Sequence, residues 1–270
     1  MLGAIIGDIA GSRFEWNRIK TKEFEFFDPA CCFTDDSVLS FAVARAILDA
    51  HGDEERLGEC AVKNMRGIGR LYPDAGYGGM FRRWLYDDDM GAYTSFGNGA
   101  AMRVSPCGFA AKTLDEARRL SKIVTEVTHN HPEGLRGAEA AAVCVFLARE
   151  GKSKSDIRSH ADTHYYPMDF TLDAIRDAYR FDETCQGTVP QAIMAFLESD
   201  SFEDAIRNAV SLGGDSDTLA AITGGIAGAH YGIPPAMRAR GVEFLDERLR
   251  TILRDFEAAY PREISEASPP

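Results

Sequence analysis

The sequence is poor in basic residues: it has 30 lysines and arginines against 42 aspartates and glutamates, a formal net charge of −12. General binding to nucleic acid needs clustered Lys and Arg side chains to neutralise phosphates. The composition therefore argues against nucleic acid as a general partner. The hydrophobic fraction of 45% and the charged fraction of 27% are those of an ordinary globular protein, which argues against a disordered or fibrous chain.

Long hydrophobic segments are also missing. The longest apolar stretch, residues 138–148, contains Glu139 and is too short to span a bilayer. Residues 1–10 lack the basic start of a signal peptide and include Asp8. These features predict a soluble, untargeted protein, which we place in the cytoplasm.

The cysteines include no Cys-x-x-Cys pair, and most lie among apolar residues. In a chain of this length, that pattern favours reduced, buried thiols in a cytoplasm over a disulfide framework or a zinc site. The six residues are Cys31, Cys32, Cys60, Cys107, Cys144 and Cys185.

No segment shows a convincing strand pattern or the turn signals of a β-hairpin. Apolar residues recur instead at intervals of three and four, as they do in amphipathic helices. We therefore expect an all-α protein, with a single domain at residues 1–262 and a frayed tail at 263–270. The clearest predicted helices cover residues 113–127, 134–150, 155–164, 171–180, 190–198, 201–211 and 235–260.

Residues 2–12 are small and apolar, with glycine at every fourth position: Gly3, Gly7 and Gly11. Glycines at this spacing line one face of a helix and let a second helix approach closely. We expect a central, buried helix here. Asp8 lies within it, and its carboxylate is costly to bury unless it is paired or bound to a metal.

Two predicted helix starts carry more acidic side chains than a helix cap can use. Residues 33–37, Phe-Thr-Asp-Asp-Ser, precede one helix, and residues 213–218, Gly-Gly-Asp-Ser-Asp-Thr, precede another. A capping role explains one aspartate at each start. Clustered oxygen donors alternatively suit a hard cation such as Mg²⁺, Mn²⁺ or Ca²⁺. Because the pattern occurs twice, we favour one metal centre shared by both helix starts.

A further candidate site lies at residues 95–103, which contain Gly97, Asn98 and Gly99. Glycine permits positive φ and exposes backbone N–H groups, as in loops that bind phosphate, although an ordinary turn explains the same residues. The helix predicted at 113–127 is followed by two histidines within residues 128–132. A histidine there can cap the helix or be presented by a loop to a substrate.

Five segments together resemble the ADP-ribosylglycohydrolase family: residues 3–15, 34–37, 95–103, 128–134 and 213–218. The resemblance spans most of the chain and implies a compact, orthogonal bundle of helices. It also implies two divalent ions, Mg²⁺ or Mn²⁺, at the base of a cleft. The implied reaction is hydrolysis of the N- or O-glycosidic bond between ADP-ribose and a modified target, at the anomeric carbon of the proximal ribose, with release of free ADP-ribose.

The resemblance assigns site residues by motif. The implied metal ligands are Thr34, Asp35, Asp36, Asp215, Asp217 and Thr218. The implied catalytic residues are Glu15 and Asp36, one of which positions or deprotonates the attacking water, and Asp74, which assists the leaving group. The implied substrate-binding residues are Ser95, Gly97, Asn98, Gly99 and Ala100 at the diphosphate, and His131 beside the distal ribose or adenine. Asp8 is expected to be a structural carboxylate near the metals.

Three alternatives stay open at this point. ADP-ribosyl-arginine on a protein is our first choice of substrate, but serine-linked, O-acetyl-linked, nucleic-acid-linked and small-molecule conjugates share the ADP-ribose that the motifs contact. A relative that binds ADP-ribose without turnover is a second alternative. A two-metal phosphoesterase is the third, although it fits the glycine loop and first helix less well. The sequence leaves open the choice between Mg²⁺ and Mn²⁺ and the oligomeric state, for which a monomer is the default.

Overall fold

The computed structural model describes residues 1–261, which fold into fourteen α-helices and one short 3-10 helix, with no strand in that range. The expected all-α class is confirmed for this part of the chain. The predicted tail at 263–270 lies outside the described residues. None of the described helices is both long and apolar enough to cross a membrane.

In chain order the elements are α1 (Leu2–Ser12), α2 (Asp35–Ala50), α3 (Glu54–Gly69), α4 (Gly79–Tyr86), η1 (Asn98–Ala100), α5 (Ser105–Ala110), α6 (Leu114–Glu126), α7 (Pro132–Arg149), α8 (Lys154–His164), α9 (Leu172–Arg176), α10 (Cys185–Leu197), α11 (Phe202–Val210), α12 (Ser216–His230), α13 (Pro235–Glu243) and α14 (Glu247–Ala259).

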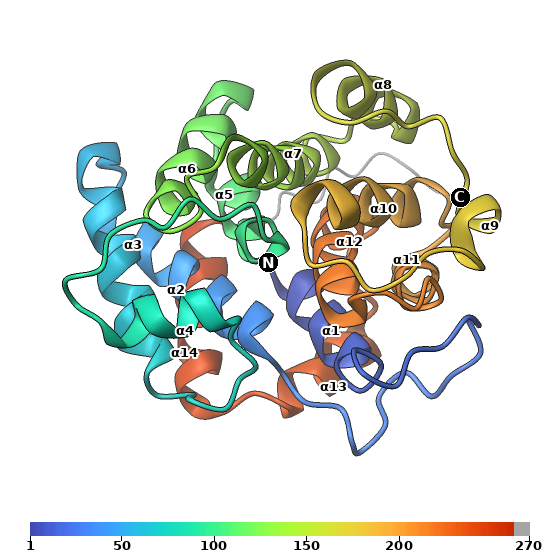
Figure 1. Cartoon of the computed structure of the whole chain (residues 1–270), viewed down its shortest axis with the longest axis horizontal. Helices are drawn as coiled ribbons and strands as arrows, with labels where there is room; N and C mark the ends of the chain where they lie inside the picture. The colour runs from blue at the N-terminus through green and yellow to red at the C-terminus, as the bar shows by residue number, and fades with distance from the viewer. Residues whose placement is uncertain (262–270) are drawn as a thin grey trace.

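Helices α1 and α12 lie side by side at the centre of the molecule (Figure 1). Gly3 faces Gly224 and Gly11 faces Ser216, so the two helices run in opposite directions. A Cβ atom on Gly3 or Gly11 would overlap the backbone oxygen of the residue opposite. The glycine spacing of the first helix is therefore confirmed as the feature that lets the two backbones meet.

Three helix ends meet beside this antiparallel pair. The end of α1 leads into the loop that carries Glu15, and it lies beside the start of α12 at Asp215 and Ser216. Helix α2 contacts both helices and begins at Asp35. Around this centre, α7, α10 and α11 pack on α12, and α3 and α14 pack on α2 (Figure 1).

Three predicted helices differ in extent from the structure. Residues 235–260 form two helices, because Asp246 Oδ1 accepts a 3.0 Å hydrogen bond from the N–H of Leu249 and caps a new helix, α14. The helix predicted from Pro190 begins earlier, at Cys185, since the side chain of Thr184 caps it there. The helix predicted at 171–180 ends at Arg176. All six cysteines are free, and all but Cys32 are buried.

The contact between α1 and α12 predicts a large stability loss when a methyl group is added at Gly7. Its Cβ would overlap the backbone oxygen of Ala220. We expect Gly7→Ala to lower the free energy of unfolding by about 3 kcal/mol or more, because backbone atoms cannot move aside as a flexible side chain can. Urea unfolding followed by circular dichroism measures the change.

Gly67→Ala is the matched control. Gly67 also lies within a helix, but a Cβ there has no neighbour within 4 Å. Alanine at that exposed site should leave stability unchanged or raise it by roughly 0.5–1 kcal/mol. Equal effects of the two substitutions would show that the backbones of α1 and α12 are not in tight contact.

Candidate active site

A cavity of about 560 Å³ opens where α1, α2 and α12 meet. The ends of these helices supply one part of its wall. The other parts are the loop and first turn at residues 76–81, the segment 93–103, and the loop at 181–184. Segments that lie far apart in the sequence therefore share one cavity.

Two groups of three carboxylates lie at this junction. The potential ligand atoms of Asp8, Asp36 and Asp217 lie within 4.8 Å of one another, and so do those of Glu15, Asp215 and Asp217. Because Asp217 belongs to both groups, they form one cluster of five acids, which we call the acidic cluster. Four of its members line the cavity, and Asp8 lies behind them.

The chemistry of the acidic cluster fits a divalent cation. Burial, followed by repulsion from neighbouring carboxylates, raises the pKa of Asp36 and Asp217 well above its usual range. Burial also raises the pKa of Glu15 to about 7 and that of Asp8 to about 6. Asp36 Oδ1 is buried without a hydrogen-bond partner among the described residues. A bound Mg²⁺ or Mn²⁺ would compensate both the crowded charge and this unsatisfied oxygen.

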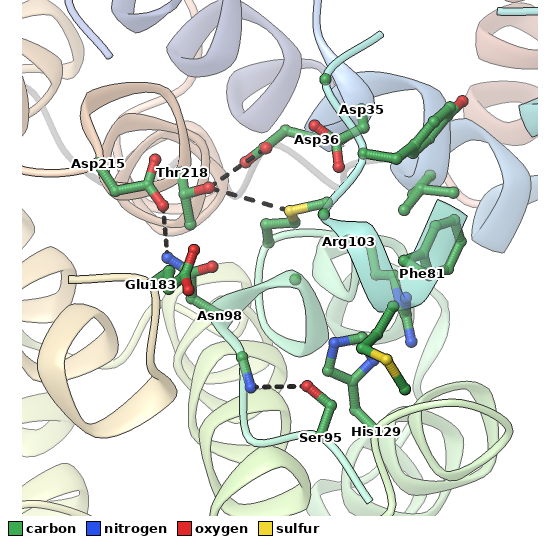
Figure 2. A pocket seen from close by; sticks show the side chains of 18 of the residues that line it. Asp35, Asp36, Phe81, Ser95, Asn98, Arg103, His129, Glu183, Asp215 and Thr218 are labelled. Atoms are coloured by element: carbon green, nitrogen blue, oxygen red, sulfur yellow. Dashed lines mark hydrogen bonds between the residues drawn. The ribbon is translucent and has the colours of Figure 1, made fainter. Parts of the chain in front are cut away.

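The two acidic helix starts lie together, as the sequence predicted. Thr218 Oγ1 donates a 3.3 Å hydrogen bond to Asp36 Oδ2, which joins the start of α12 to the start of α2 (Figure 2). Five of the six predicted metal ligands line the cavity, namely Asp35, Asp36, Asp215, Asp217 and Thr218. The sixth, Thr34, is not among the lining residues: its hydroxyl donates to Asp8 Oδ1 at 2.7 Å and accepts from the Asp36 N–H.

Asp8 has the structural role that was expected for it. Its Oδ2 accepts hydrogen bonds from the N–H groups of Thr34 at 2.9 Å and Ser37 at 3.1 Å, and also from the Ser37 hydroxyl. Unpaired N–H groups at a helix start are favourable partners for a carboxylate. A side chain from the middle of α1 thus fixes the first turn of α2, which carries Asp36.

The glycine loop, residues 95–99, is tied directly to the acidic cluster. Asn98 Nδ2 donates to Asp215 Oδ2 at 2.7 Å and to Thr188 Oγ1 at 3.1 Å. The Asn98 N–H donates to the Glu183 carbonyl, and the Gly97 N–H donates to Ser95 Oγ. Since these two N–H groups are already used, a phosphate at this loop needs other donors.

Of the predicted substrate-binding residues, Ser95, Gly97, Asn98 and Gly99 line the cavity. Ala100 and His131 are not among the lining residues. His131 caps α7, since its Nδ1 accepts a hydrogen bond from the Glu133 N–H at 3.1 Å, and its ring lies against the ring of Phe96. His129 lines the cavity in its place.

His129 belongs to a buried network with Arg103 and Thr128. Arg103 Nη2 donates to Thr128 Oγ1 at 2.6 Å, and that oxygen lies 2.8 Å from His129 Nδ1. The hydroxyl has one proton, for which the Thr125 carbonyl at 3.4 Å and His129 Nδ1 at 2.8 Å compete, and the shorter contact favours donation to Nδ1. The ring proton of His129 is then on Nε2, the nitrogen nearest to Gly97 and Gly99. Burial, followed by the charge of Arg103, lowers the pKa of His129 well below its usual range. The ring is therefore a neutral donor aimed at the glycine loop.

Asp74 lies apart from the residues described so far. Its side chain is exposed and is not among those that line the cavity, whereas Gly76 and Tyr77 of the same loop are. Its role beside the leaving group stays a prediction.

Sequence motifs did not identify several of the residues that line the cavity. Trp16, Tyr93, Phe181 and Glu183 lie in loops without a hydrophobic period, and long-range contacts bring them to the cavity. One such contact is the isolated bridge between Gly97 and Thr184. His129 was within reach of sequence analysis, because it lies in the same segment as His131.

The model of the family described as ADP-ribosylglycohydrolase matches residues 1–265 of the chain. The chain is 24% identical over 312 residues to ADP-ribosylhydrolase ARH3 of Bos taurus, covering 86% of this chain and 84% of that protein. It is 31% identical over 144 residues to ADP-ribosylarginine hydrolase Tri1 of Pseudomonas putida, covering 51% of this chain and 39% of that protein.

A solved structure described as an ADP-ribosylglycohydrolase-related protein complex has the same fold. It aligns with a TM-score of 0.63 at 24% sequence identity, and the alignment covers 97% of both chains.

The raised carboxyl pKa values predict that the metal-free protein loses stability as the pH rises. A carboxyl group whose pKa is raised on folding holds its proton more tightly in the folded than in the unfolded chain. Folding is therefore favoured at low pH and becomes less favourable as the pH rises through the raised pKa, about 6 for Asp8 and about 7 for Glu15. In EDTA, we expect the thermal midpoint to fall between about pH 5 and about pH 8, and saturating Mg²⁺ or Mn²⁺ to raise it at the higher pH.

Differential scanning fluorimetry measures both effects. Asp217→Asn should reduce the pH dependence and the shift caused by the metal, since it removes a charge from the acidic cluster. Asp169→Asn, at an exposed acid outside the cavity, is the control and should change neither. A midpoint that rises with pH in EDTA would contradict the assigned pKa shifts.

The network around His129 predicts an imidazole that is neutral and protonated on Nε2 at pH 6.5, where an ordinary histidine is half protonated. Ring ¹⁵N chemical shifts distinguish the two tautomers and the imidazolium. Thr128→Val should disturb the tautomer, and Thr128→Ser should preserve it, because serine keeps the hydroxyl. A charged ring at this pH, or a proton on Nδ1, would rule out the proposed network.

Proposed function

The chain belongs to the ADP-ribosylglycohydrolase family, and we propose that it hydrolyses the bond between ADP-ribose and arginine on a modified protein in the cytoplasm, releasing free ADP-ribose. The family consists of hydrolases that act on glycosyl bonds. One observation carries the proposal: the acidic cluster and the glycine loop line the same cavity. The hydrogen bond from Asn98 to Asp215 joins them. The relative named as an ADP-ribosylarginine hydrolase supports the choice of arginine.

The cluster and its neighbours would hold two divalent ions, Mg²⁺ or Mn²⁺. The proposed ligands are Thr34, Asp35, Asp36, Asp215, Asp217 and Thr218, of which Thr34 is the least direct because its hydroxyl already bonds Asp8. When bound, such ions supply positive charge that orients the ribose hydroxyls and makes a water molecule more acidic.

Glu15 is our first choice for the residue that holds the proton of the attacking water. Its carboxylate is half-buried at the cavity wall and belongs to the acidic cluster. In the metal-free protein burial raises its pKa to about 7, and a carboxylate at the cavity wall can accept a proton from water there. Asp36 is the alternative, although one of its oxygens already accepts from Thr218.

In the proposed reaction, the water oxygen forms a bond to the anomeric carbon of the proximal ribose, and the water proton passes to Glu15. The bond from that carbon to the guanidine nitrogen breaks, and the electron pair remains on the nitrogen, which takes up a proton. Asp74 is proposed to assist this departure. Such displacements pass through a cation-like sugar, which nearby carboxylates stabilise.

The rest of ADP-ribose is proposed to lie along the glycine loop. Since the N–H groups of Gly97 and Asn98 are already used, His129 Nε2–H is a suitable donor to the diphosphate. Phe96 lines the same wall, and its ring centre lies 5.2 Å from that of His131, which is not a lining residue. The distal ribose or adenine is proposed to bind on the cavity side of Phe96, with His131 next to that wall.

Substitution of Asp217, which belongs to both groups of three carboxylates, tests the proposal. We expect Asp217→Ala to lower release of ADP-ribose from ADP-ribosyl-arginine by about 1,000-fold or more in saturating Mg²⁺ or Mn²⁺. Asp169→Ala is the control, and circular dichroism checks that both variants fold. Full activity of Asp217→Ala would remove the acidic cluster from the mechanism.

The substrate panel in the same assay includes serine-linked and O-acetyl-linked ADP-ribose, and products are separated by chromatography. Free ADP-ribose as the product supports glycosyl hydrolysis. AMP or phosphate would identify a phosphoesterase instead, and binding without turnover on every conjugate would identify a non-catalytic relative.

A further inference from the structure

Three of the large hydrophobic side chains exposed in the described part of the chain lie on the cavity wall. They are Trp16, Met80 and Phe96, which are 74%, 51% and 43% exposed. Trp16 is the most exposed large hydrophobic residue of the described part. A tryptophan left open to solvent beside a cavity marks a surface that binds something.

Trp16 is oriented by a ring contact. Its ring stacks on Phe181, with the ring centres 5.5 Å apart and the planes inclined by 23°. The ring is therefore oriented by its contacts, while most of its surface stays open.

The aromatic pair already binds one guanidinium group. The Arg18 guanidinium carbon lies 5.3 Å from the centre of the Phe181 ring. Guanidinium groups stack flat on aromatic rings, and tryptophan attracts cations more strongly than tyrosine or phenylalanine does. The open face of Trp16 offers a second position of the same kind.

The position of Trp16 decides which end of the substrate lies there. Glu15, its neighbour in the chain, belongs to one carboxylate group with Asp215 and Asp217, and the proposed function puts the scissile bond at this group. The donor proposed for the diphosphate, His129, lies at the glycine loop instead. The diphosphate therefore lies towards His129 and the glycine loop, and the Trp16 end is left to the group on the other side of the scissile bond.

We propose that the open face of Trp16 is the subsite for the leaving group, and that it selects a planar cation, the guanidinium of arginine, over a neutral leaving group. This inference rests on the proposed function, because it assumes that ADP-ribose occupies the rest of the cavity. Trp16 is thereby a specificity-determining residue.

Substitution of Trp16 separates this role from a general one. We expect Trp16→Ala to lower kcat/KM for ADP-ribosyl-arginine by about 3- to 30-fold, the range of a cation–π contact, and to change kcat/KM for the serine-linked conjugate by less than about twofold. Trp16→Phe keeps an aromatic face without the indole N–H, so it should retain most of the preference for arginine. Tyr86→Ala, at an exposed aromatic residue outside the cavity, should leave both values unchanged.

Three outcomes would overturn the inference. Equal losses on both substrates would show that Trp16 acts through Glu15 or contacts the common ADP-ribose, adenine included. An unchanged preference in Trp16→Ala would show that its face binds no leaving group. A Trp16→Phe variant as impaired as Trp16→Ala would assign the effect to the indole N–H rather than to the aromatic face. Thermal midpoints check that each variant is folded.

If the proposed function is wrong, the wild-type protein turns over none of the ADP-ribose conjugates, and this result is separate from those at Trp16. A binding experiment then still tests the subsite. Trp16 is exposed and Trp84 is 1% exposed, so quenching of tryptophan fluorescence reports chiefly on Trp16. Agmatine, a planar guanidinium, should quench saturably in the presence of ADP-ribose, and cadaverine, an ammonium of similar length, should quench less. Absence of saturable quenching by agmatine would overturn the inference.

Discussion

The close contact between the backbones of α1 and α12 is the constraint on which the site depends. Glycines of α1 face the backbone of α12, so the two helices pack closely along their length. The end of α1 therefore lies beside the start of α12. Glu15 follows the first of these ends, and Asp215 precedes the second. Helix α1 also supplies Asp8, which accepts hydrogen bonds at the start of α2 and so positions Asp36. One helix thus places acids from three separate segments at a single point.

Bringing these carboxylates together costs electrostatic free energy, and the fold reduces that cost only in part. The starts of α2 and α12 both point into the cluster, and the positive end of a helix dipole favours negative charge. Asn98 and Thr218 donate hydrogen bonds to Asp215 and Asp36. Burial, followed by repulsion between the carboxylates, still raises the pKa of Asp36 and Asp217 well above the usual range. A bound cation would compensate both effects, so the site fits one.

The features that sequence analysis could predict are those with a local physical signal. A glycine at every fourth position implies a close helix contact, and surplus acids at two helix starts imply a shared centre. Trp16 and Phe181 had no such signal, since long-range packing of irregular loops brings them together. His129, which lines the cavity, was not identified from the sequence, because the hydrogen bond between Arg103 and Thr128 that orients it is tertiary. The break before α14 was missed because apolar periodicity continues across the Asp246 cap.

The cavity has acidic residues at one end and a buried cation at the other. At one end the acidic cluster adjoins Trp16. At the other, Arg103 is buried beside His129, and its Nε and Nη1 atoms have no hydrogen-bond partner among the described residues. Burial lowers the pKa of Arg103 only to about 10, so it stays a cation at neutral pH. An anionic diphosphate at the Arg103 end is therefore stabilised by a cation of the protein itself. The divalent ions proposed for the acidic cluster would offset part of its negative charge, so the direction of the substrate depends on the buried Arg103 rather than on repulsion at both ends.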